Sequence, residues 1–136
     1  MNSRSIFLQL MLIGGCLLLV DHDSLAQTPQ VTRTELQRAA ISNLTGHEGV
    51  MYKAVIVPGG AAAKHTHPGD EFLYILKGTL IVEAEGKAPV TLNVGDSFYQ
   101  PSGTPHLAKN GSTTDPVEVL VFLVVESGKP LASAVE

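Results

Sequence analysis

Two histidines one residue apart, His65 and His67, lie a short distance before Glu71 and offer side chains that can do chemistry. Side chains alternate between the two faces of a β-strand, so His65 and His67 are expected to project to the same side. The segment Pro68-Gly69-Asp70 predicts a turn, because proline presets φ and glycine tolerates positive φ. Such a turn returns Glu71 to the two imidazoles, and the sequence therefore predicts that two imidazoles and a carboxylate converge.

A third histidine, His106, follows a stretch rich in glycine and proline at 95–105 and is expected to begin a new strand. Neutral imidazole nitrogens and a carboxylate oxygen are ligands for a borderline divalent metal. A purely structural role for all four groups is disfavoured, because burying four unpaired polar groups is costly. We therefore predict a divalent transition metal (Mn, Fe, Ni, Co, Zn or Cu) bound by His65, His67, Glu71 and His106.

The segment 59–110 resembles the two signature motifs of the cupin family. The first motif runs through Gly59, His65-Thr66-His67, Glu71 and Gly78, and the second through Gly95, Pro101-Ser102-Gly103, His106 and Asn110. The short gap between the motifs is similar to that of small microbial cupins. This resemblance implies a cupin type-2 conserved barrel, which is a double-stranded β-helix or small jelly roll with the metal inside.

The remaining pattern is that of an all-β protein. Short apolar runs alternate with turn residues, helical periodicity is nearly absent, and 136 residues are enough for one domain with its own core. Strands are expected at 50–57, 72–76, 79–84, 90–92, 97–99, 106–109 and 117–125. Tight hairpins are expected at Lys77-Gly78 and at Asn110-Gly111. The signal at 31–40 is weak, and it allows either a strand at 31–36 or a short helical turn at 35–40.

Residues 1–26 have the pattern of a signal peptide, with Arg4 as the positive region, an apolar run at 6–20 and Ser24-Leu25-Ala26 as the cleavage site. The apolar run of about 15 residues is short for a membrane anchor, which needs about 20. We therefore expect a single mature domain at 27–136 that is exported to the periplasm or secreted, with no stable membrane span after cleavage. The only cysteine, Cys16, is removed with the signal peptide, so no disulfide or catalytic thiol is expected.

Composition limits the partners. The net charge is −4 with no basic run, which argues against nucleic acid as a partner. The segment 117–125 has one charge, Glu118, and then an unbroken apolar run from Val119. This run predicts a strand covered by the barrel on one face and by a second subunit on the other, hence a homodimer. A small-molecule ligand or substrate is the remaining expected partner.

Four ligands leave two positions open on a six-coordinate ion, which is enough for dioxygen or an oxygen-containing substrate. We therefore predict a metal-dependent oxidoreductase of dioxygenase type, in which Glu71 is a ligand that can detach and act as a base. The alternative is a non-enzymatic periplasmic module that binds a small molecule or a metal. Asp70 is expected to serve the turn and His47 to lie on the surface, while Tyr52, Phe98 and Tyr99 are candidates to line the pocket.

Overall fold

The computed structural model describes residues 30–135, and the predicted signal peptide lies outside them. Within this part of the chain the regular structure consists of strands alone: β1 (Val31–Ala40), β2 (His47–Ile56), β3 (Ala61–Thr66), β4 (Asp70–Lys77), β5 (Thr79–Ala84), β6 (Val90–Asn93), β7 (Ser97–Gln100), β8 (His106–Asn110), β9 (Val117–Glu126) and β10 (Ser133–Ala134). A search of the same residues for a helix that could cross a membrane found none.

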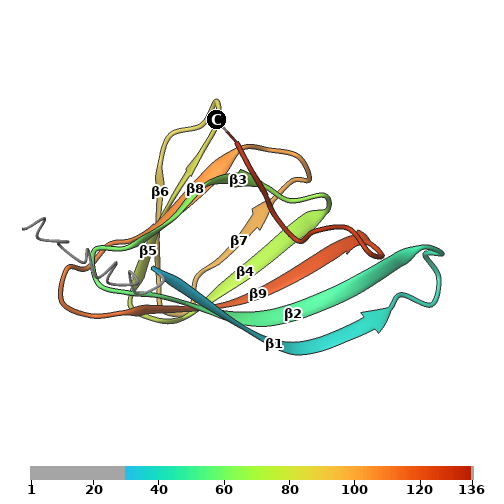
Figure 1. Cartoon of the computed structure of the whole chain (residues 1–136). Helices are drawn as coiled ribbons and strands as arrows, with labels where there is room; N and C mark the ends of the chain where they lie inside the picture. The colour runs from blue at the N-terminus through green and yellow to red at the C-terminus, as the bar shows by residue number, and fades with distance from the viewer. Residues whose placement is uncertain (1–29, 136) are drawn as a thin grey trace, which may run out of the picture.

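The strands form two antiparallel sheets that face each other (Figure 1). One sheet has the order β1-β2-β9-β4-β7 and the other the order β10-β3-β8-β5-β6. From β2 to β5, and again from β6 to β10, each strand is followed by one in the opposite sheet, so the chain crosses the barrel repeatedly. This arrangement confirms the predicted all-β, jelly-roll architecture.

The two predicted hairpins are wrong. β4 pairs with β7 and β9, whereas β5 pairs with β6 and β8, so Gly78 turns the chain from one sheet into the other. Gly78 has a φ of 76°, and a Cβ there would lie 2.9 Å from the carbonyl oxygen of Pro116. β4 buries Leu73 and Ile75, β5 buries Leu80 and Val82, and the crossing from one sheet to the other lets both strands contribute to the same core.

Asn110 also leads into a crossing loop and not a hairpin. Its side-chain amide donates hydrogen bonds to the carbonyl oxygens of Ile56, Val57 and Asp115, and its side-chain oxygen accepts one from the backbone N–H of Ser112. These bonds fix the loop that leads to β9. None of these hydrogen bonds involves a predicted metal ligand. Asn110, the last residue of the second motif, therefore stabilises the fold.

Residues 31–40, where the sequence signal is weak, form a strand, and the alternative of a short helical turn at 35–40 is wrong. β1 pairs antiparallel with β2, from Val31 opposite Ile56 to Ala40 opposite Glu48, with an irregularity between Glu35 and Gln37. Most of its side chains are exposed. The backbone pairing with β2 therefore decides the conformation where the local sequence signal does not.

The core lies between the two sheets, and β9 crosses its centre. Alternate residues of β9, from Val117 to Val125, are buried, whereas the residues between them are only partly buried. Buried side chains of β2, β4 and β5 complete the core, with Val50, Ile75 and Leu80 nearly inaccessible. One face of β9 is thus covered by the barrel as expected, and its outer face is partly open in the single chain.

Candidate metal centre

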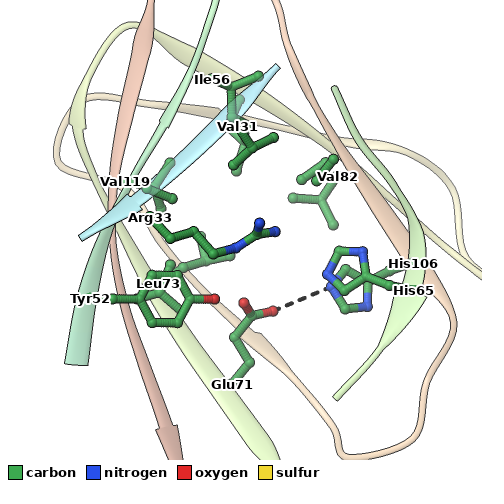
Figure 2. Close-up of a pocket in the computed structure, with 15 residues that line it drawn as sticks. Val31, Arg33, Tyr52, Ile56, His65, Glu71, Leu73, Val82, His106 and Val119 are labelled. Carbon is green, nitrogen blue, oxygen red and sulfur yellow. Dashed lines mark ion pairs between the residues drawn. The ribbon is translucent and has the colours of Figure 1, made fainter. Parts of the chain in front are cut away.

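The crossing topology brings the four predicted ligands together. His65 lies in β3 and His106 begins β8, and the two are direct register partners in one sheet. His67 follows the end of β3, and the turn through Gly69 carries the chain to Glu71 in β4 of the opposite sheet. Figure 2 shows the Glu71 carboxylate facing the imidazoles of His65 and His106 across the pocket.

Backbone carbonyl groups orient all three imidazoles. The Nδ1 atom of His65 lies 2.7 Å from the carbonyl oxygen of Ala63, that of His106 lies 3.0 Å from Thr104, and that of His67 lies 2.5 Å from Leu131. A carbonyl oxygen only accepts, so each Nδ1 carries the proton and each Nε2 has a free lone pair. This is the arrangement by which metal-binding histidines are held in the correct tautomer.

The free ring nitrogens converge. The ligand nitrogens of the three histidines lie within 4.8 Å of one another, and the Nε2 atoms of His65 and His67 are 3.2 Å apart. Glu71 closes the group, with Oε1 3.3 Å from Nε2 of His67 and Oε2 3.4 Å from Nε2 of His106. With neutral imidazoles these atoms are all acceptors, and a cation between them would stabilise acceptors at such distances.

The distances fit a metal ion. Metal–nitrogen and metal–oxygen bonds of about 2.1 Å place adjacent ligand atoms about 3.0 Å apart at right angles and about 3.4 Å apart at the tetrahedral angle. The three separations from 3.2 to 3.4 Å lie within this range. In addition, Oε2 of Glu71 has no hydrogen-bond partner among residues 30–135 although it is buried. The donor set and its geometry therefore fit a divalent ion.

Burial and the neighbouring polar groups shift the pKa values of Glu71 and His106 in opposite directions. Burial opposes ionisation of Glu71, but its contacts with His106 and His67 outweigh burial and lower the pKa of this carboxyl to about 2. Burial likewise opposes protonation of His106, yet Glu71 and the Thr104 carbonyl raise its pKa. For His65 burial dominates and lowers the pKa. Glu71 is therefore held as a carboxylate, the form that binds a metal.

A pocket opens beside the four residues. Its volume is about 450 Å³, including the part open to solvent, and only a small inner part is enclosed. Its walls are mostly aliphatic and include Ile56, Leu73, Leu80, Val82, Val119 and Val121. The inner part holds about three waters or a ligand of similar size.

Two polar residues in this pocket extend the predicted site. Tyr52 is buried, and burial together with the charge of Glu71, only partly offset by Arg33, raises the pKa of its hydroxyl to about 12. Arg33 projects from β1 into the pocket (Figure 2). Sequence reasoning named Tyr52 as a candidate but missed Arg33. The only available signal was that Val31 and Arg33 lie on one face of a segment whose structure was itself uncertain.

The other residues named in the sequence analysis, Asp70, His47, Phe98 and Tyr99, lie outside the pocket. Asp70 accepts hydrogen bonds from the Tyr99 hydroxyl and from the backbone N–H of Ser102, so it ties the second motif to β4 and is not paired with Glu71. His47 begins β2 and lies outside the pocket. Tyr99 is exposed and Phe98 packs against the core, so neither lines the pocket.

The family model described as Cupin domain matches residues 52–125, which is more than half of the 136-residue chain. This chain belongs to the cupin family. The match covers all four predicted ligands of this cupin and confirms the resemblance of the two motifs. A comparison of the cupin with curated proteins found no match.

Solved structures share the cupin fold. A recombinant oxalate oxidase in complex with glycolate has a TM-score of 0.62 and 24% identity, over 79% of this chain and 57% of that one. Rru_A2000 from Rhodospirillum rubrum, a cupin-2 domain, has a TM-score of 0.61 and 20% identity, over 79% and 66% of the two chains. The DMSP lyase DddQ from Ruegeria pomeroyi DSS-3 has a TM-score of 0.56 and 27% identity, over 63% of this chain and 42% of the lyase. The cupin thus spans less than half of the lyase.

Proposed function

We propose that this cupin binds one divalent transition metal through His65, His67, Glu71 and His106, and that it is an oxidoreductase of dioxygenase type acting on a small oxygen-containing organic substrate. The observation that carries the proposal is the convergence of three Nε2 lone pairs, each oriented by a backbone carbonyl, on a carboxylate that faces an open pocket. When bound, the metal supplies Lewis acidity and a site for dioxygen. Its identity among Mn, Fe, Ni, Co, Zn and Cu is left to experiment.

The residues of the pocket support chemistry as well as binding. Aliphatic side chains from both sheets exclude bulk water, which strengthens polar interactions inside the pocket. Glu71 lines the same pocket with a buried carboxylate oxygen that lacks a hydrogen-bond partner in the described chain, so it is positioned to accept a proton from a bound substrate. An oxalate oxidase has the same fold, which supports oxidation of a small substrate as a reaction that this fold can accommodate.

We further propose that the protein acts outside the cytoplasm, in the periplasm or as a secreted protein. The support is the sequence pattern at 1–26 alone. Fusing this segment to a reporter that is active only after export tests the proposal, and a reporter that remains inactive contradicts it.

The test of the metal site compares the purified wild-type domain with a His65→Ala/His106→Ala variant by elemental analysis. Wild type is expected to contain about one ion per chain, and the double variant very little, because two remaining ligands do not offset dehydration of the ion. His47→Ala is the matched control, since His47 lies outside the pocket. Full metal content in the double variant would overturn the assignment.

The test of activity measures O₂ uptake by protein loaded with each metal, across a panel of phenols, diketones and organic acids. Uptake with at least one substrate, lost on removal of metal, supports the oxidoreductase. Metal and ligand binding without turnover of any compound would favour the alternative, a non-enzymatic binding module.

A further inference from the structure

Arg33 is the only Arg or Lys among the described residues that line the pocket, and its guanidinium points from β1 toward the imidazoles (Figure 2). It forms no ion pair with a carboxylate in residues 30–135. The only carboxylate lining the pocket, Glu71, contacts His67 and His106. Glu71 and Arg33 thus line one pocket without a direct ion pair between them.

Several other cations among the described residues do form ion pairs. Arg38, on the same strand, pairs with Glu35 at 2.8 Å and also with Glu48. Lys53 pairs with Glu118, and Lys64 with Glu85. These pairs lie among exposed or partly exposed side chains, where solvent screens them. Arg33 is also exposed, but it lines a hollow with aliphatic walls and has no carboxylate partner among the described residues, so its guanidinium is available to an incoming anion.

The chemistry of the guanidinium narrows the class of ligand. Its planar fork of N–H donors matches the two oxygens of a carboxylate and binds them in parallel. The small inner volume of the pocket excludes a bulky anion such as a nucleotide. The imidazoles lie at the other side of the pocket, where the proposed metal would bind a second oxygen of the same ligand molecule.

We propose that the ligand of this pocket is a small organic carboxylate, with its carboxylate bound by Arg33 and another oxygen directed to the centre formed by His65, His67, Glu71 and His106. This inference rests on the proposed metal function for the second contact. Arg33 is then the residue that selects anionic over neutral ligands. It reaches the pocket from β1, a strand that contributes no metal ligand.

The test uses malonate, which has a carboxylate at each end, and malonamide, a neutral molecule of the same shape in which an amide replaces each carboxylate. Isothermal titration calorimetry at neutral pH on Mn²⁺-loaded protein gives both dissociation constants for wild type, Arg33→Gln and Arg38→Gln. We expect wild type and Arg38→Gln to bind malonate more tightly than malonamide, with about tenfold of this preference due to the charged hydrogen-bonded contact with Arg33. Arg33→Gln should lose this tenfold part of the preference while keeping its metal content.

Elemental analysis of the same samples separates the two proposals. Equal metal content in all three proteins, with no malonate preference in wild type or an unchanged preference in Arg33→Gln, overturns the role of Arg33 and leaves the metal site intact. Absence of metal from wild type overturns the proposed function, and the same ratio measured on chelator-treated protein then decides the role of Arg33. If Arg33→Gln does not fold by circular dichroism, Arg33→Met, which keeps the apolar part of the side chain, replaces it.

Discussion

The Nδ1 atom of His67 lies 2.5 Å from the carbonyl oxygen of Leu131, which is 64 residues further along the chain. The same C-terminal segment forms β10, whose Ala134 pairs with His65 and whose Ser133 pairs with Thr66. Leu131 also packs against the core. The segment after β9 therefore orients one predicted ligand and pairs with the strand that holds another.

Deletion of residues 131–136 is expected to weaken metal binding by about 10–100-fold, the usual effect of losing a group that orients a ligand. The measurement is competition with a chromophoric chelator. Lys129→Ala is the control, because it removes only an exposed ion pair with Glu126. Unchanged affinity in the deletion variant would show that the Leu131 carbonyl does not position His67.

Glu71 should make the metal-free protein sensitive to acid. Its pKa falls from 4.5 to about 2 on folding, so the unfolded state binds more protons between these values. The stabilisation is complete above about pH 4.5, is lost as pH falls toward 2, and amounts to ~3 kcal/mol.

Urea unfolding of chelator-treated protein at pH 5 and pH 3 measures this effect. Wild type should lose much of that stability at the lower pH, and Glu71→Gln, which keeps the shape of the side chain without its charge, should lose less. An equal loss in both proteins would assign the acid sensitivity to other carboxylates.

Added metal should raise the melting temperature more at pH 7.5 than at pH 5.5. Protons compete with the ion for the imidazoles once the pH falls toward the ordinary histidine pKa of about 6.5, and an ion that binds only the folded state stabilises it. Calorimetric melts with and without metal provide the measurement. A melting temperature that does not respond to metal at either pH would argue against a loaded site.

Gly69 should be essential to the crossing between His67 and Glu71. A Cβ at Gly69 would lie 1.8 Å from the carbonyl oxygen of Val124, so Gly69→Ala forces backbone to move and should cost about 3 kcal/mol. Gly86→Ala is the control, because a Cβ at Gly86 meets nothing within 4 Å and only its positive φ opposes the change. Denaturant melts of both variants test this, and equal losses would contradict it.

The outer face of the sheet β1-β2-β9-β4-β7 is expected to mediate the predicted homodimer. One row of register partners crosses β2, β9, β4 and β7 and places Met51, Phe122, Phe72 and Tyr99 side by side. The rings of Phe72 and Tyr99 lie 5.1 Å apart, and both side chains are about half exposed. An apolar row of this kind on a surface is typical of an interface.

Phe122→Asp should therefore dissociate the dimer in sedimentation velocity at micromolar concentration. Val94→Asp is the control, since Val94 is an exposed apolar residue outside this row. Wild-type protein that sediments as a monomer would contradict the prediction.

The sequence alone determined the features that depend on neighbouring residues. Alternation placed His65 and His67 on one side, the turn at Pro68-Gly69-Asp70 returned Glu71 to them, and the spacing of the two motifs indicated the cupin family. The strands at 72–76 and 79–84 were likewise readable, because each is a short run of mostly apolar residues bounded by turn residues.

Only the tertiary structure decided which strands pair. Gly78 and Asn110 have the composition of hairpin turns, yet each leads to the opposite sheet, because pairing depends on long-range burial that a dipeptide does not encode. The carbonyl of Leu131 reaches His67, and Arg33 reaches the pocket, through crossings that bring distant segments together. A backbone carbonyl has no sequence signature, and an arginine on a weakly predicted strand has no defined direction, so these contacts exist only once the barrel closes.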